Sequence, residues 1–382
     1  MSKQRLDSID LLRGLVMIVM VLDHVRDFFH AGSQQFSPED LTKTDAVLFF
    51  TRWITHFCAP VFVLLAGAGI SFSTLSRDGN RAVSRFLIAR GLWLIFLELT
   101  VLNFAFSFRV PYDILLLQVI WAIGWSMIAM AGLIWLPRRV LAVLAIAMIL
   151  LHNTADGLQI ASPVWKFLHV ISFGNFKGMP VLLAYPLIPW IGVMAAGFCL
   201  GDVMRLEPDR RRTVLLRIGS GMTMAFVVLR FLNIYGDPAP WDGSSFLSFF
   251  RATKYPPSLI YLLMTLGPSL ILLGWIDRAR VAEFHPLRVF GRVPMFYYLL
   301  HFYLVHALAV VLGWLRYGDW TLLLRMPPAI TGEFPPGFPQ DYGYSLGMTY
   351  LIWAAVVVAL YPPCRWYMQF KQRSRAAWTG YL

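Results

Sequence analysis

Ionisable side chains gather in the second half of the first apolar segment. The run from Leu15 to Leu22 is apolar, and the residues that follow it are Asp23-His24-Val25-Arg26-Asp27-Phe28-Phe29-His30. Charged groups at membrane depth cost on the order of several kcal/mol each unless they are paired or face a cavity. The segment therefore predicts a site, in which we expect His24, His30 and Asp27 to be the catalytic residues.

The spacing within this segment suggests general-base chemistry. His24 and Asp27 are three residues apart and share one face of a helix, as do Arg26 and His30, which are four apart. Histidine changes its charge closest to neutral pH, so it can take up and release a proton during a reaction. Asp27 would orient the His24 ring and stabilise its charged form. The alternative is an ion network that only holds helices together.

Most histidines fall on one side of the predicted helices. All but His285 of the eight lie in the half of an apolar segment away from the arginine-rich loops, or in a loop on that side: His24, His30, His56, His152, His169, His301 and His306. A single histidine in such a place is usually a satisfied interfacial side chain. Their number on one side indicates a site there.

Several of these groups have neighbours at helical spacing. Arg52 and His56 are four residues apart, whereas five residues separate His301 from His306, about 140° around a helix. Glu98 lies in the middle of an apolar run and needs a cation from another helix, for which we expect Arg26 or Arg52. The predicted substrate-binding residues are Arg26, Arg52, His56, Glu98, Lys254, His301 and His306.

The elements that must position these residues are membrane helices. Of the 382 residues, 58% are hydrophobic and 14% are charged, against about 25% charged in soluble domains. A spanning helix needs roughly 20 mostly apolar residues, which predicts an all-α polytopic transmembrane bundle of about ten helices, with roughly nine to eleven as the range. We expect one domain over residues 1–382. The predicted segments are 11–30, 52–75, 84–107, 114–136, 139–152, 182–203, 213–235, 256–276, 289–315 and 345–368.

Basic residues indicate the orientation of these helices. Lysine and arginine cluster at both termini and in the loops that follow the second, fourth, sixth and eighth segments. Lys3 and Arg5 belong to the N-terminal cluster and Arg375 to the C-terminal one. Because loops rich in lysine and arginine stay inside, both termini are predicted to be cytoplasmic. The net charge of +12 is then explained by topology, and we expect no nucleic-acid partner.

This orientation places three arginines at the cytoplasmic ends of helices. They are Arg13, Arg90 and Arg292, and they are the predicted cofactor-binding residues because guanidinium groups suit phosphates. Eleven residues separate Arg13 from His24, about 16 Å of helix. His24 would thus lie just past the middle of a hydrocarbon core of roughly 30 Å.

The outer loops are expected to be ordered lids or re-entrant segments without regular secondary structure. Residues 31–51 are polar and mildly acidic, and residues 153–181, 236–255 and 316–344 are rich in glycine, proline and aromatic residues. The three cysteines, Cys58, Cys199 and Cys364, are scattered, so we expect neither a structural disulfide nor a metal site. The first apolar segment lacks a cleavage site of small residues and should remain as a helix.

Several stretches resemble a known family. The opening Arg5-Leu6-Asp7-Ser8-Ile9-Asp10-Leu11-Leu12-Arg13-Gly14 resembles the start of the heparan-alpha-glucosaminide N-acetyltransferase catalytic domain family. The spacing of Arg13 and His24 is similar to that in the related acyltransferase-three proteins. Residues 50–67, 254–258 and 298–303 also resemble bacterial members of the family. The resemblance covers essentially the whole chain, and it specifies a family but no substrate.

The resemblance implies a transmembrane acetyltransferase of the bacterial inner membrane. It implies acetyl-CoA as the acyl donor, bound from the cytoplasmic side at Arg13, Arg90 and Arg292, and an outer acceptor, commonly a sugar or glycan amine or hydroxyl. The resemblance implies one difference at this position. The lysosomal enzyme of the family has Asn where this chain has His24, and its key histidine stands before an alanine, as His30 does here. The base is therefore His24 or His30, and the spacing from Arg13 favours His24.

Other classes of protein and other routes stay open on the sequence. Transfer could be direct or could pass through an acetyl-histidine. A proton-coupled transporter would also need buried histidine, glutamate and arginine. A membrane haem protein would need facing histidines, for which His56 and His301 are candidates. A structural scaffold would leave the outer cluster unexplained. The predicted partners are the lipid bilayer, acyl-CoA and the acceptor, with a homodimer as one alternative for the oligomeric state.

Overall fold

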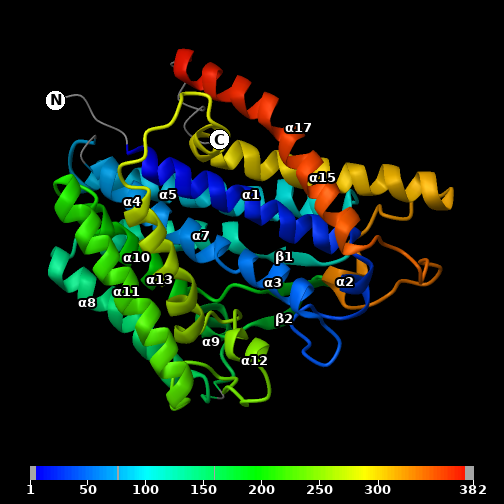
Figure 1. The fold of residues 1–382 in the computed structure, drawn as a ribbon, viewed down its shortest axis with the longest axis horizontal. Helices are drawn as coiled ribbons and strands as arrows, with labels where there is room; N and C mark the ends of the chain where they lie inside the picture. The colour runs from blue at the N-terminus through cyan, green and yellow to red at the C-terminus, as the bar shows by residue number, and fades with distance from the viewer. Residues whose placement is uncertain (1–5, 75–76, 159, 375–382) are drawn as a thin grey trace. The chain divides into compact units, whose positions relative to one another are not determined.

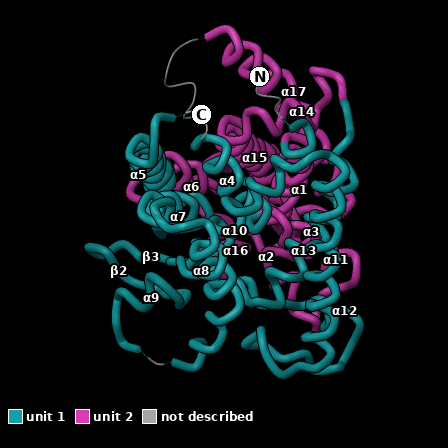
Figure 2. The backbone as a smooth tube through the Cα atoms, turned by 90° about the vertical axis from the view of Figure 1, so that its left-hand side faces the viewer, with its two compact units in different colours: residues 1–9, 59–99, 114–280 teal, residues 10–58, 100–113, 281–382 magenta. Residues whose placement is uncertain are grey.

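The computed structural model describes residues 6–74, 77–158 and 160–374, which are mostly helical and form two compact units (Figure 2). The first unit comprises residues 1–9, 59–99 and 114–280, and the second comprises residues 10–58, 100–113 and 281–382. Lys3, Arg5 and Arg375, which we assigned to the basic termini, lie outside the described residues.

The first unit contains a group of apolar helices that pack in pairs. Helix α5 packs against α7, α10 packs against α7 and α8, and α11 packs against α13. The helices of this unit are α4 (Cys58–Thr74), α5 (Gly79–Leu97), α7 (Val119–Leu133), α8 (Arg138–Leu151), α9 (Pro163–His169), α10 (Leu187–Val203), α11 (Pro208–Leu232), α12 (Phe246–Phe250) and α13 (Leu259–Trp275). A π-helical turn, η1 (Glu98–Leu102), follows α5, and a 3-10 turn, η2 (His152–Ala155), follows α8.

The first unit also holds a small sheet, which the sequence did not lead us to expect. Strand β3 (Met179–Leu183) pairs in parallel with β1 (Leu115–Leu117) and antiparallel with β2 (Ser172–Phe176). The turn between β2 and β3 is Lys177-Gly178, whose φ angles of 51° and 88° suit the two-residue hairpin turns that match strand twist. The prediction of an irregular 153–181 loop is therefore wrong.

The second unit is built around α1 (Asp7–Phe29) and two long helices near the C-terminus (Figure 1). Helix α15 packs against α6, α14 and α17, and α2 packs against α16. The remaining helices of the unit are α2 (Ala31–Gln35), α3 (Ala46–Thr55), α6 (Asn103–Ser107), α14 (Pro286–Arg292), α15 (Pro294–Tyr317), α16 (Pro328–Thr331) and α17 (Leu346–Arg373). Short helices thus occupy parts of the predicted loops 31–51 and 316–344, and α12 occupies part of 236–255, which corrects the expectation of irregular structure there.

Every predicted apolar segment contains a helix, so the prediction of a mainly helical membrane protein is confirmed. Within the described residues, six stretches are long and apolar enough to cross a membrane: Ala46–Thr74, Gly79–Ser107, Arg138–Ala155, Pro208–Leu232, Pro294–Tyr317 and Leu346–Arg373. Helices α7, α10 and α13 are apolar but shorter. The total of about ten spans and the cytoplasmic location of both termini stay predictions.

Several predicted boundaries are wrong for local reasons. The predicted segment 114–136 begins with β1, and 182–203 begins with the end of β3. The segment 289–315 is divided between α14 and α15 just before Pro294, and 52–75 is divided between α3 and α4 two residues before Pro60. Proline has no N–H to continue the hydrogen-bond ladder, so a new helix begins near it.

Candidate functional site

An ion network surrounds the end of α1. The Nη1 atom of Arg52 lies 2.7 Å from both carboxylate oxygens of Asp23, and Thr55 donates a hydrogen bond to the same carboxylate at 3.0 Å. Arg26 Nη2 lies 2.8 Å from Asp23 and 2.7 Å from Asp27. Positive and negative groups therefore alternate along α1 and α3, and each charge faces an opposite one.

The network continues into the loop between α2 and α3. Arg52 donates from Nε to Glu39 at 3.2 Å, and the Nε2 atom of His56 lies 2.8 Å from the same carboxylate oxygen. The side chain of His56 is only 3% exposed, whereas that of Glu39 is 30% exposed. The predicted residues Arg26, Arg52 and His56 thus belong to one cluster that extends from the interior of the second unit toward its surface.

Arg26 retains hydrogen-bonding capacity within this cluster. Its side chain is 3% exposed, and its Nε and Nη1 atoms are buried without a hydrogen-bond partner among the described residues. A buried donor that is left unsatisfied costs about 1–3 kcal/mol. This pair of N–H groups is therefore suited to hold an oxygen atom of a bound molecule.

His24 faces a cluster of rings, not the carboxylate that we predicted. Its ring centre lies 5.2 Å from that of His301, 4.2 Å from that of Phe302 and 6.4 Å from that of Phe106. Asp27 pairs instead with Arg26. The expected orientation of His24 by Asp27 is therefore wrong, because the adjacent guanidinium group takes up that carboxylate.

The hydrogen bonds of His301 leave one of its nitrogens open. Its Nδ1 atom lies 3.3 Å from the carbonyl oxygen of Tyr297, one turn earlier on α15, and can only donate there. The neutral ring then carries a lone pair on Nε2, which is buried without a hydrogen-bond partner in the described part of the chain. The half-buried His24 and the buried His301 form a pair of imidazoles, one of which can accept a proton.

His30 and His306 are engaged in holding the fold. The Nδ1 atom of His30 accepts the backbone N–H of Ser33 at 3.1 Å and caps the start of α2. Both ring nitrogens of His306 lie 2.6 Å from carbonyl oxygens, those of Ala105 and Leu323. These contacts distinguish His30 and His306 from His24, which instead lies among rings.

A second arginine cluster lies at the other end of α1. Arg13 donates to the carbonyl oxygen of Gly291 at 2.9 Å, and Asp10 lies 3.5 Å from Arg13 and 3.3 Å from Arg292. The helices approach closely here, since a Cβ atom on Gly14 would lie 1.9 Å from the carbonyl oxygen of Leu287. Two predicted cofactor-binding arginines are thus joined through one buried carboxylate.

The other predicted site residues belong to the first unit. The carboxylate of Glu98 accepts the backbone N–H of Gln118 at 3.0 Å, at the start of α7. A carboxylate in this place stabilises the helix dipole. The prediction that Arg26 or Arg52 is its partner stays a prediction, and within the second unit those arginines pair with Asp27 and Asp23.

Lys254 and Arg90 are the remaining two predicted site residues of the first unit. Lys254 is 8% exposed, and its Nζ atom lies 5.1 Å from the ring centre of Tyr255. Arg90 is half-buried on α5. The residues around Lys254 are held by Asp237, whose carboxylate accepts hydrogen bonds from Thr253 and Ser258.

Sequence reasoning missed the centre of the ion network. Asp23 joins Arg26, Arg52 and Thr55, and Glu39 joins Arg52 and His56, yet neither carboxylate was among the predicted site residues. The separation of Asp23 and Arg26 by three residues was a usable signal for the first. Glu39 lies in a loop, where no helical spacing in the sequence could single it out.

Comparison with known proteins identifies the family. The family model for the catalytic region of heparan-alpha-glucosaminide N-acetyltransferase matches residues 5–235. No curated protein matches the chain. The matched family is one of acetyltransferases, which agrees with the apolar helices of a membrane protein and does not favour a transporter. The match covers more than half of the sequence, so the chain belongs to the heparan-alpha-glucosaminide N-acetyltransferase catalytic family.

Proposed function

We propose that this protein transfers an acetyl group from cytoplasmic acetyl-CoA to an amine or hydroxyl of a sugar on the outer side of the membrane, with His24 as the general base. The family's printed name makes the amino group of an α-glucosaminide the first acceptor to try. The membrane would then separate the donor from the acceptor, and α1 would carry groups for both.

The arrangement of α1 is the observation that supports this proposal. Its His24 ring packs against His301, and its Arg26 holds two buried N–H groups without a partner among the described residues. Arg13 lies eleven residues earlier, about 16 Å along the helix. In this proposal, one helix carries the base, the oxygen-binding group and, toward its other end, a phosphate-binding group.

The chemistry requires one proton transfer in each direction. His24 takes the proton from the acceptor amine or hydroxyl as the acceptor's nitrogen or oxygen attacks the thioester carbonyl carbon. The N–H groups of Arg26 stabilise the negative charge that develops on the carbonyl oxygen. The carbon–sulfur bond then breaks, and the departing CoA sulfur receives the proton from His24. His301 can share that proton, because its Nε2 has a lone pair.

The donor is held by the arginines at the cytoplasmic end. Arg13 and Arg292 both lie beside the carboxylate of Asp10, and their guanidinium groups are of the kind that suits the phosphates of CoA. Because the pantetheine arm of CoA is an extended chain, it can place the thioester away from the phosphates.

The test is acetyl transfer by purified protein in detergent, with radiolabelled acetyl-CoA and p-nitrophenyl α-glucosaminide as the probe acceptor. We expect His24→Ala to lower the rate by about 100-fold or more, as for loss of a general base. His30→Asn is the matched control, because asparagine also caps a helix, and its rate should stay near that of the wild type. Full activity in His24→Ala would overturn the role of His24.

Two further measurements separate the parts of the proposal. Acetyl-CoA should raise the thermal stability of the wild type and of His24→Ala alike, and the rise should be smaller in Arg292→Gln. Incubation with labelled acetyl-CoA without acceptor should leave the protein unlabelled if transfer is direct. Stable label on histidine would instead indicate an acetyl-histidine intermediate.

A further inference from the structure

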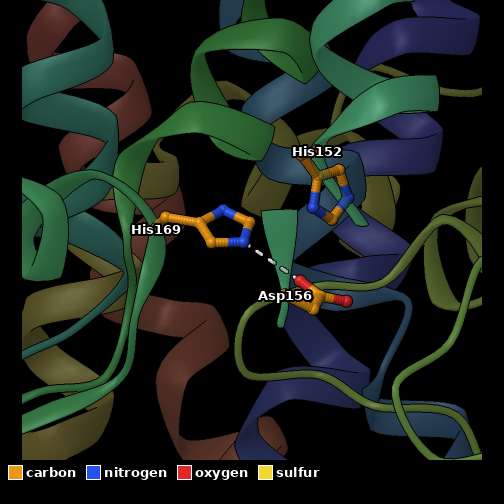
Figure 3. Close-up of side chains that lie close together, drawn as sticks. All are labelled: His152, Asp156 and His169. Carbon is orange, nitrogen blue, oxygen red and sulfur yellow. Dashed lines mark hydrogen bonds and ion pairs between the residues drawn. The ribbon is translucent and has the colours of Figure 1, made fainter. Parts of the chain in front are cut away.

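Three side chains of types that can bind metal ions lie close together in the first unit, more than 100 residues after α1. His152 and Asp156 lie in and just after the turn η2 that ends α8, and His169 is the last residue of α9 (Figure 3). One ligand atom from each residue lies within 4.8 Å of the others. The side chains of His152 and His169 are 5% and 2% exposed, so both imidazoles are buried, while Asp156 is half-buried.

One imidazole of this group makes no hydrogen bond among the described residues. His169 Nε2 lies 3.0 Å from a carboxylate oxygen of Asp156, while both ring nitrogens of His152 are buried without a hydrogen-bond partner among the described residues (Figure 3). The Nδ1 atom of His169 is also without one there. Leaving a buried polar atom unsatisfied costs about 1–3 kcal/mol. A ligand that binds imidazole nitrogen would remove this cost.

The carboxylate is already held in place by its surroundings. The second oxygen of Asp156 accepts a hydrogen bond from Asn153 Nδ2 at 2.7 Å, and Asn153 Oδ1 in turn accepts the backbone N–H of Leu259 at 2.8 Å. Hydrogen bonds of this kind orient the ligands of metal sites.

We propose that His152, Asp156 and His169 bind a zinc ion that joins the end of α8 to α9 and so supports the β2–β3 hairpin that follows. Two imidazoles and one carboxylate are a donor set that zinc sites use, with a fourth position open to water. Zinc bonds of about 2.0–2.2 Å place ligand atoms roughly 3.3 Å apart. The widest pair must close by about 1.5 Å, which rotation of the two histidine side chains supplies.

Besides this rotation, binding needs a change of tautomer in His169. Its Nε2 proton, now directed at Asp156, moves to Nδ1, and Nε2 binds the metal ion with its lone pair. His152 binds through either nitrogen and keeps its proton on the other. The carboxylate and two neutral rings carry one negative charge, which zinc more than balances. An ordered water would satisfy one nitrogen of His152 but would leave the site without metal.

The decisive measurement is the metal content of the full-length protein in detergent, freed of any affinity tag and never exposed to chelator. We expect about one zinc per chain by mass spectrometry. Removal with EDTA should lower the Tm by about 4 °C or more, and ZnCl2 should restore it. Cobalt added to the EDTA-treated protein should give the visible absorption bands of a tetrahedral site.

Variants distinguish this site from adventitious binding. His152→Ala and Asp156→Asn should each lose the zinc, the cobalt bands and the response of Tm to ZnCl2, while His285→Ala, a histidine of the second unit, should keep all three. If His152→Ala does not fold, His152→Gln and the wild-type measurements decide the question. Wild-type protein without zinc, cobalt bands or a zinc-dependent Tm overturns the proposal, as does a response that survives in both site variants. None of these readouts requires acetyl transfer.

Discussion

The Nη1 atom of Arg52 lies 2.7 Å from both carboxylate oxygens of Asp23, although the two residues are 29 positions apart. This pair ties α3 to α1 immediately before His24. Arg52 is 14% exposed and Asp23 is 15% exposed, so water screens the pair only in part. The ion network therefore supports α1 at the point where its proposed base lies.

Replacing Asp23 by asparagine should weaken this support. Asp23→Asn removes a charged partner of both Arg52 and Arg26. We expect a loss of about 1.5–3 kcal/mol of stability, the range for hydrogen bonds to charged groups. Thermal unfolding in detergent measures it. The control is Lys43→Gln, which removes an exposed pair with Asp40 at 3.8 Å and should change stability by about 0.5 kcal/mol or less. Equal effects of both variants would contradict the importance of the network.

Arg26 is predicted to act on the transition state in addition to its ion pairs. Arg26→Lys keeps the positive charge but loses the Nε and Nη1 groups, and we expect kcat/KM for acetyl transfer to fall by about 100-fold, as on removal of one oxyanion donor. Steady-state kinetics with labelled acetyl-CoA check this. Arg316→Lys, a change on the exposed end of α15, is the control. Unchanged kinetics in Arg26→Lys would remove Arg26 from the proposed mechanism.

His306 should be important for stability but not for the chemical step. Glutamine at this position cannot reproduce both of the 2.6 Å contacts to carbonyl oxygens. We expect His306→Gln to lose about 1–3 kcal/mol of stability while its rate per folded molecule stays near wild type. Unfolding curves and activity normalised to folded protein separate the two. A stable but inactive His306→Gln would assign His306 to catalysis instead.

The close approach of α1 and α14 should not tolerate a methyl group. A Cβ atom on Gly14 would lie 1.9 Å from a backbone oxygen of Leu287, which cannot rotate away. We expect Gly14→Ala to cost about 1–3 kcal/mol or more, and to weaken stabilisation by acetyl-CoA because Arg13 is adjacent. Gly69→Ala is the matched control, since its Cβ would meet nothing within 4 Å. If Gly14→Ala were as stable as Gly69→Ala, the helices could not approach as described.

Alkaline pH should release the segment before α17. The hydroxyl of Tyr342 donates to the carbonyl oxygen of Phe28 at 2.7 Å, and burial raises the pKa of Tyr342 well above its ordinary value of 10.0. Its contribution to stability is therefore fully present below the unfolded pKa and is lost as pH rises above about 10. Tm measured from pH 8 to 11 should fall more steeply in the wild type than in Tyr342→Phe. Parallel curves would show that this tyrosine does not govern the loss.

The sequence was sufficient to predict the kind of protein and to select part of the candidate site. Low charge and long apolar runs predict membrane helices whatever their neighbours are, and the family could be named from ordered local motifs such as Arg5–Gly14. His24, Arg26 and Arg52 could be selected because ionisable groups in apolar segments are costly. Arg13 and Arg292 could be selected because basic residues gather at cytoplasmic ends.

Partner choice was decided by the tertiary structure. Asp27 was expected to orient His24 but pairs with Arg26, and Glu98 accepts the backbone N–H of Gln118 at the start of α7. His152, Asp156 and His169 were not expected to form a group, because the turn and α9 that bring them together had no periodic signal. Helical periodicity specifies which residues share a face of one helix. It does not specify which groups from distant segments meet, because that depends on the packing of the helices and on which partner gives the lower free energy once both are buried.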